Sequence, residues 1–160
     1  MPRSFLGLGS NEGDSLSQIE SALSELPERG VPLVRTSRLY RTEPVGGPPQ
    51  DWYVNAVAEV GFEGEPIDLL RVCRVIESLH GRKRPGKNAP RTLDLDILLF
   101  GAGVYESPEL TIPHPRLRER RFVLVPMVEI APDVLDPISG LTMRELLSRC
   151  PDESAVLPTF

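Results

Sequence analysis

Two aspartates alternate with apolar residues in one short segment, and this pattern constrains the fold more than any other. Residues 93–100 read Leu-Asp-Leu-Asp-Ile-Leu-Leu-Phe. Because side chains alternate between the two faces of a strand, we expect Asp94 and Asp96 to share one face. At a rise of about 3.3 Å per residue, their carboxylates would lie about 7 Å apart. The apolar residues expected on the other face are Leu93, Leu95 and Ile97.

An acid pair on an apolar strand needs an explanation, because carboxylates are costly to bury without a counter-charge. Hard carboxylate oxygens suit Mg²⁺, so a metal site is one interpretation of Asp94 and Asp96. The alternative is an edge strand that shows two ordinary acidic residues to solvent. The strand alone does not decide between these interpretations. The residues that flank it are therefore needed to choose between them.

The basic residues gather on either side of this strand. The chain has a formal net charge of −5, yet eleven of its 18 lysines and arginines lie in residues 71–91 and 116–121. Cations collected beside an acid pair indicate a small polyanionic ligand bridged by a metal ion. The alternative is a solvated basic face. The negative net charge argues against a general nucleic-acid binder.

Length and composition indicate one globular domain over residues 1–160, with 40% hydrophobic and 26% charged residues. No apolar run approaches the roughly 18 residues of a transmembrane helix, and the N-terminus lacks a signal-peptide pattern. We therefore expect a cytoplasmic protein without a membrane partner. Cys73 and Cys150 lie far apart, and we expect them to be free thiols, with Cys73 in the core.

Hydrophobic periodicity predicts the element order β-α-β-β-α-β followed by helices, which is the ferredoxin-like α+β arrangement. Residues 42–50 are too rich in Gly and Pro for regular structure, and residues 151–160 carry no clear signal. On the second helix we expect Glu77 to face away from the apolar stripe, as an ion-pair residue. The predicted strands cover residues 4–8, 31–40, 53–62 and the acid-pair segment. The predicted helices cover residues 15–26, 66–79, 122–130 and 142–148.

Six short motifs in a fixed order resemble the 6-hydroxymethyl-7,8-dihydropterin pyrophosphokinase family. The resemblance runs from about residue 4 to about residue 137, and its most specific element is Pro-Arg-Thr-Leu-Asp-Leu-Asp at residues 90–96. The other motifs are Gly9-Ser10-Asn11, Tyr40-Arg41-Thr42-x-Pro44, Tyr53-x-Asn55-Ala56, Gly81-Arg82-x-Arg84 and Pro113-His114-Pro115.

The resemblance implies a ferredoxin-like enzyme of folate biosynthesis with C-terminal helices added to the sandwich. Its reaction moves the β,γ-diphosphate of ATP onto the hydroxymethyl oxygen of a reduced pterin and releases AMP. Asp94 and Asp96 would hold two Mg²⁺ ions, and ATP would be the co-substrate. We expect a monomer whose partners are these two small molecules, with no nucleic acid.

By matching position, the resemblance also implies the residues of the site. Arginine suits phosphates because its planar fork is bidentate, and a flat pterin needs aromatic faces and an amide edge. The residues implied in catalysis are Arg82, Arg91, Asp94 and Asp96. Those implied at ATP are Arg84, Arg91, Ile97, Thr111, His114 and Arg120. Those implied at the pterin are Thr42, Pro44, Val45, Tyr53, Asn55, Asp94 and Phe122.

The residues themselves leave other interpretations open. Without the resemblance, His114 between two prolines is a rigid turn residue, and Tyr53 and Phe122 are ordinary core or surface aromatics. The chain also departs from some family members, with Asn88 in place of a tryptophan and Pro115 in place of an aromatic residue. The competing functions are a single-stranded nucleic-acid binding module on the same fold and a divalent-metal nuclease or nucleotidyltransferase.

Overall fold

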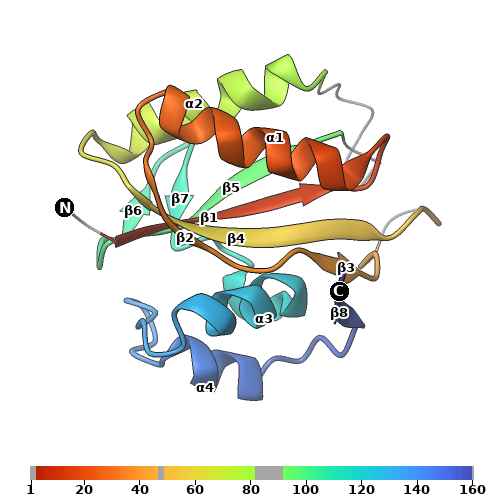
Figure 1. The fold of residues 1–160 in the computed structure, drawn as a ribbon. Helices are drawn as coiled ribbons and strands as arrows, with labels where there is room; N and C mark the ends of the chain where they lie inside the picture. The colour runs from red at the N-terminus through yellow and green to blue at the C-terminus, as the bar shows by residue number, and fades with distance from the viewer. Residues whose placement is uncertain (1–2, 47–48, 82–91, 160) are drawn as a thin grey trace.

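The structure, a computed structural model, describes residues 3–46, 49–81 and 92–159. It is mixed α/β, with an antiparallel sheet between two helical layers (Figure 1). The helices are α1 (Ser15–Glu28), α2 (Pro66–Leu79), α3 (Arg121–Ile130) and α4 (Met143–Ser148), with a 3₁₀ turn at Leu117–Glu119. The strands are β1 (Arg3–Ser10), β2 (Leu33–Thr36), β3 (Tyr40–Thr42), β4 (Tyr53–Gly61), β5 (Asp94–Phe100), β6 (Tyr105–Glu106), β7 (Thr111–Ile112) and β8 (Val156–Pro158).

The main sheet has the strand order β5-β1-β4-β3-β8, and β2 pairs with β4 beside β3. Each of these pairings is antiparallel. The strand β1 therefore lies between β4 and β5, and these are the three longest strands that the structure describes. Helices α1 and α2 cover one face of the sheet, and α3 and α4 cover the other (Figure 1). A separate hairpin is formed by β6 and β7.

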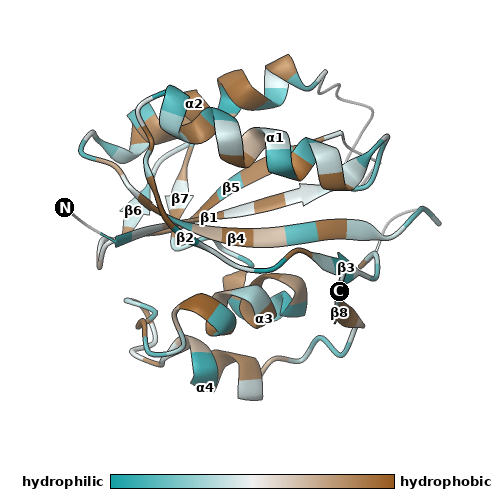
Figure 2. Cartoon of the chain, in the orientation of Figure 1, coloured by the Kyte–Doolittle hydropathy of each residue, from teal (hydrophilic) through white to brown (hydrophobic). Residues whose placement is uncertain are grey.

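Two apolar cores pack on opposite faces of the sheet. Each strand residue joins only one of them, because successive side chains point to opposite faces. Figure 2 shows hydrophobic and hydrophilic residues alternating around α1 and α2, as expected for helices that bury one side. The core under α1 and α2 includes Leu6, Leu8, Ile19, Leu26, Leu69, Ile76, Leu93 and Leu95. The core against α3 and α4 includes Phe5, Leu98, Leu99, Leu117, Leu124 and Met127.

Local capping fixes where the helices begin. The Asp14 carboxylate accepts a hydrogen bond from the Ser17 N–H at 3.2 Å and starts α1, as one of the two predicted caps. Pro66 occupies the first turn of α2, and Glu65 and Asp68 form a capping box there. The predicted starts of both helices are confirmed. In the described part of the chain, no helix is both long and apolar enough to cross a bilayer.

The prediction of one strand over residues 31–40 was wrong, because Ser37 interrupts it. The Ser37 N–H donates to the Val57 carbonyl at 2.9 Å, and the Ser37 hydroxyl accepts from the Val57 N–H at 3.0 Å. The Ser37 hydroxyl thus accepts the hydrogen bond that a backbone carbonyl would accept in a regular strand ladder. The segment consequently divides into β2 and β3.

Residues 151–160, which carry no clear sequence signal, supply the strand β8. Thr42 pairs with Val156, and Tyr40 with Pro158. The proline is tolerated because β8 is an edge strand. Both cysteines are free thiols, and Cys73 is fully buried as predicted.

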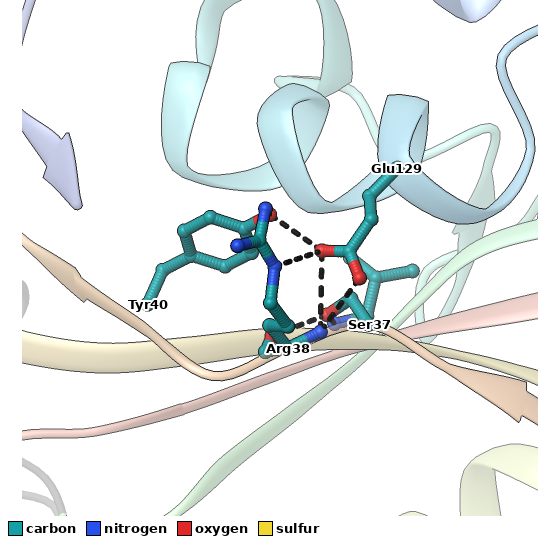
Figure 3. A network of polar contacts seen from close by, with 5 residues as sticks. Ser37, Arg38, Tyr40 and Glu129 are labelled. Carbon is teal, nitrogen blue, oxygen red and sulfur yellow. Dashed lines mark hydrogen bonds and ion pairs between the residues drawn. The ribbon is translucent and has the colours of Figure 1, made fainter. Parts of the chain in front are cut away.

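A polar network fastens α3 to the segment between β2 and β3 (Figure 3). The carboxylate of Glu129 on α3 accepts a hydrogen bond from the Tyr40 hydroxyl at 2.5 Å and from the Arg38 N–H at 3.0 Å. The Arg38 guanidinium lies 3.6 Å from the same carboxylate. Because Tyr40 is only 3% exposed, its hydroxyl depends on this partner.

Replacing Glu129 should therefore lower the free energy of unfolding. We expect Glu129→Ala to cost about 1–3 kcal/mol in urea denaturation, because it leaves the buried Tyr40 hydroxyl without its acceptor. Asp133→Ala is the matched control, since Asp133 pairs with Arg144 in an exposed ion pair. Its cost should stay below about 1 kcal/mol. Equal costs for the two variants would contradict the role of the network.

Candidate functional site

A cleft of about 410 Å³ opens on the face of the sheet that carries α3. Its walls come from the ends of β4 and β5, from the loop after β3 and from the segment that leads into α3. Its floor is β1 between them. The residues lining it include Gly7, Gly9, Thr42, Val45, Gln50, Tyr53, Asn55, Arg74, Asp94, Asp96, His114, Arg116, Arg120 and Phe122.

The acid pair lies in this cleft, as the alternation along β5 predicted. Asp94 and Asp96 line the cleft, while their apolar neighbours Leu93, Leu95 and Ile97 are buried in the core under α1 and α2. The carboxylates are partly buried, with 31% of the Asp96 side chain exposed. The interpretation of the two residues as ordinary acids on a solvent-facing edge does not fit this position.

Burial and like charge make the acid pair electrostatically costly. Burial, followed by the negative charge of Asp94, raises the pKa of Asp96 well above its usual range. The positive charge of Arg120 acts in the opposite direction but does not cancel the shift. A pair in this state gains more from a bound cation than an exposed pair would.

His114 lies at the edge of the acid pair in its neutral form. Its Nε2 atom is 3.9 Å from the Asp96 carboxylate. Burial, followed by the positive charge of Arg120, lowers the pKa of His114 to about 4. At neutral pH the two residues are therefore not an ion pair. His114 Nδ1 accepts a hydrogen bond from the Arg116 N–H at 3.1 Å, so the neutral imidazole carries its proton on Nε2 and can donate from there.

Two side chains of α2 hold the acid-pair strand in place from outside the sheet. The Leu95 N–H donates to the Glu77 carboxylate at 2.8 Å, and the Leu95 carbonyl accepts from Arg74 at 3.3 Å. Arg74 also donates to Glu77 at 2.8 Å. Since β5 ends the sheet, these side chains satisfy backbone groups that no further strand pairs.

This arrangement corrects one prediction. Glu77 does form an ion pair, but it does not face away from the apolar stripe of its helix. It is 1% exposed and lies on the buried side of α2, where its carboxylate reaches the edge of the sheet. The helical pattern could not reveal a buried glutamate whose partner is a backbone N–H on another element.

A buried amide forms the opposite wall of the cleft. The Thr42 hydroxyl donates to Asn55 Oδ1 at 2.5 Å, and Asn55 Nδ2 donates to the Leu8 carbonyl at 3.3 Å. Asn55 is 8% exposed, and both contacts are buried. An amide has two acceptor lone pairs and two N–H donors, so one of each stays available to a ligand. Tyr53 lines the cleft on the same face of β4.

A cationic and aromatic pair closes the cleft from the side of α3. Phe122 lies in the first turn of α3, and the Arg120 guanidinium lies over its ring at 5.4 Å from the ring centre. This is a cation–π distance. Burial lowers the pKa of Arg120, and the negative charges of Asp96 and Asp94, which line the same cleft, oppose this shift without cancelling it. The guanidinium and the carboxylates therefore face the same space.

The structure brings together most of the described residues predicted for the site. Three predicted residues in the described ranges are not among those lining the cleft: Pro44, Ile97 and Thr111. The Ile97 side chain is 3% exposed and lies in the core, so any ligand contact by this residue would use its backbone. The predicted Arg82, Arg84 and Arg91, and the Asn88 departure, lie outside the described residues.

Sequence reasoning also missed several lining residues. The most informative are Gly7 and Gly9, which form the floor of the cleft. They alternate along β1 with Leu8, which is buried in the opposite core. The available signal was glycine at residue 7 of the predicted strand and again two residues later, just after its predicted end, because glycines at this spacing mark a face without side chains. Arg74 and Arg116 belong to the two basic segments but carried no specific signal.

The donor set fits a magnesium ion that shares its ligands with a substrate. Within the described ranges, no group of three or more His, Cys, Asp or Glu side chains could hold a metal ion. Magnesium is commonly bound by one or two carboxylates, with substrate phosphates and water completing the shell. Asp94 and Asp96 meet that requirement in a cleft large enough for a ligand.

Comparison with known proteins gives consistent matches over nearly the whole chain. The pyrophosphokinases of Methylorubrum extorquens and Pseudomonas aeruginosa are each 42% identical to it, over 93% and 94% of this chain and 94% and 93% of those proteins. The folic acid synthesis protein fol1 of Schizosaccharomyces pombe is 41% identical over 93% of this chain, which spans only 20% of that protein.

Solved structures share the fold at lower identity. Plasmodium falciparum HPPK-DHPS with pterin and p-hydroxybenzoate matches with a TM-score of 0.73 and 18% identity, covering 92% of this chain and 42% of that chain. The chain thus spans less than half of that longer protein. The model of the 7,8-dihydro-6-hydroxymethylpterin-pyrophosphokinase (HPPK) family matches residues 5–132. With the curated relatives above, this match shows that the chain belongs to the HPPK family.

Proposed function

We propose that the cleft is the active site at which this chain transfers the β,γ-diphosphate of ATP to the hydroxymethyl oxygen of 6-hydroxymethyl-7,8-dihydropterin. The products are AMP and the pterin diphosphate, in a step of folate biosynthesis. Membership of the family carries the reaction to this chain. One observation carries the location: a single cleft holds an acid pair, a cationic segment and an amide-and-aromatic wall.

Asp94 and Asp96 are proposed to hold two Mg²⁺ ions. Their partial burial and like charge support a cation site, because a bound cation would stabilise the charged form of Asp96, whose pKa is raised by burial and by the charge of Asp94. When bound, magnesium supplies positive charge to phosphate oxygens and lowers the pKa of a coordinated hydroxyl. The carboxylates themselves then position the reacting groups, since phosphoryl transfer needs alignment and charge neutralisation more than a protein nucleophile.

The ATP side of the cleft is proposed to lie along the segment from His114 to Arg120. A planar guanidinium can bind phosphate oxygens in a bidentate manner, and neutral His114 can donate a hydrogen bond from Nε2 to the nucleotide. Thr111 and the backbone of Ile97 are proposed as further nucleotide contacts. The remaining members of the proposed phosphate-binding set are Arg82, Arg84 and Arg91.

The pterin is proposed to lie against β4 and the first turn of α3. Phe122 and Tyr53 offer aromatic faces to a flat ring, and the remaining donor and acceptor of Asn55 can meet its hydrogen-bonding edge. Val45 and Pro44 would extend this wall from the loop after β3. The Thr42 hydroxyl orients the Asn55 amide and so sets which edge of the pterin is recognised.

The remaining proposals concern the whole molecule. We propose a ferredoxin-like fold over one domain, which the order β5-β1-β4 with β2 and β3 on the far side of β4 supports. We also propose that the chain acts as a monomer in the cytoplasm, with small-molecule substrates and no nucleic-acid partner. Family membership does not support the nucleic-acid module or the nuclease considered above.

The acid pair should be essential for turnover but not for folding. We expect Asp94→Asn and Asp96→Asn each to lower pterin-dependent AMP release by at least about 100-fold, because each removes a charge that holds magnesium. The unfolding free energy should hold or rise, since like-charge repulsion is relieved. Asp133→Asn, an exposed carboxylate outside the cleft, is the control. Wild-type turnover in either cleft variant would disprove the metal role.

Phe122 should matter for the pterin and not for the nucleotide. We expect Phe122→Leu to weaken pterin binding about fivefold to tenfold, because it removes an aromatic face worth about 1 kcal/mol. Binding of a non-hydrolysable ATP analogue should change less than twofold in calorimetric titrations. Phe62→Leu makes the same chemical change at an aromatic residue packed on the other core. A similar loss of pterin affinity in the Phe62→Leu control would contradict a specific contact between Phe122 and the pterin.

A further inference from the structure

Gly9 occupies the one position of β1 that lies between the amide wall and the acid pair. In the sheet register it is opposite Asn55 on β4 and opposite Asp94 on β5. Its neighbour on the same face, Gly7, is opposite Val57 and Asp96. A side chain at residue 9 would therefore enter the cleft between the two groups that the proposed function assigns to the pterin.

The space above Gly9 is already filled by the Asn55 amide. A β-carbon built on Gly9 would lie 2.6 Å from Asn55 Nδ2 and 3.9 Å from the Tyr53 ring carbon Cδ2. Real β-carbons essentially never approach another heavy atom that closely. A β-carbon built on Gly7 would meet the Leu98 side chain at 3.4 Å, which is close to an ordinary van der Waals contact.

The Asn55 amide has little freedom to move away. Thr42 holds its oxygen at 2.5 Å, and its nitrogen donates to the Leu8 carbonyl, the backbone group that directly precedes Gly9. Displacing the amide would break these buried hydrogen bonds, and an unpaired buried amide is costly. The contact between Asn55 and the backbone of β1 is therefore possible only because residue 9 has no side chain.

Backbone conformation does not explain this glycine. Gly9 lies inside the extended strand β1 and is not one of the glycines with positive φ, such as Gly13 and Gly30. Any residue can adopt an extended backbone. The requirement for glycine at this position is therefore steric and arises from the residue that packs on it.

We propose that Gly9 is a positioning residue for the pterin. By leaving room for the Asn55 amide against β1, it fixes the orientation of the one donor and one acceptor that remain for the ligand. This inference rests on the proposed function, and it names a specificity determinant that acts through Asn55 without touching the reacting atoms.

The direct test is Gly9→Ala, measured by calorimetric titration of 6-hydroxymethyl-7,8-dihydropterin at saturating magnesium and non-hydrolysable ATP analogue. We expect the pterin Kd to rise by about tenfold or more, while the Kd of the ATP analogue changes less than twofold. Gly7→Ala adds the same methyl group to the same face, and its effect on the pterin Kd should be several times smaller. Equal effects of the two variants, or an unchanged pterin Kd, would overturn the proposal.

A double-mutant cycle tests whether the effect passes through Asn55. In an Asn55→Ala background the contested space is empty, so Gly9→Ala should change the pterin Kd less than twofold. If Gly9→Ala alone does not fold but the double variant does, the glycine is required for folding and not for positioning the pterin, and the proposal is overturned. Additive losses, or two variants that both fail to fold, would refute it. Wild-type protein that gives no pterin-dependent AMP would instead count against the proposed function.

Discussion

The alternation of side chains along three adjacent strands gives the sheet one face that is covered by an apolar core and one face that carries the cleft. On β1, β4 and β5, one set of residues packs under α1 and α2 and forms a continuous apolar core. The other set serves two purposes. At one end of the sheet it packs against α3 and α4, and at the other end it carries the acid pair, the amide wall and a floor of glycine. A shift of one residue in any of these strands would exchange the two sets.

The charges of the site follow from the same division. Asp94 and Asp96 lie on one face of β5, and because the other face is deeply buried, the strand cannot turn to carry either residue out of the cleft. The edge of that strand is secured by Glu77 and Arg74, which satisfy the backbone of Leu95 between the two acids. The ion pair of Arg74 and Glu77 thus helps to hold the strand that carries the two like charges. The magnesium ions that we propose for this site would offset this repulsion.

The sequence predicted the parts of this arrangement that depend on periodicity. The alternation of the acid pair and the starts of the two main helices followed from spacing and capping residues alone, and the structure has them where they were expected. Interactions between distant elements could not be read in the same way. Ser37 breaks a strand through a bond to Val57, and Glu77 is buried because it meets the backbone of Leu95. Neither residue type signals such a partner locally. Gly9 was noticed only as part of a motif, and its steric reason appears once Asn55 lies across it.

The strand β8 pairs with β3, which lies far earlier in the chain. Val156 pairs with Thr42, and the backbone of Ala155 exchanges hydrogen bonds with Glu43, 112 residues earlier in the chain. The short strand that carries Thr42 therefore depends on a neighbour that is synthesised much later than β3 itself. Until residues 156–158 leave the ribosome, one edge of β3 stays unpaired, and the Thr42 hydroxyl that holds the Asn55 amide lies on this strand. The orientation of that amide, through which we propose the pterin is recognised, is therefore secured only after the distant β8 has been made.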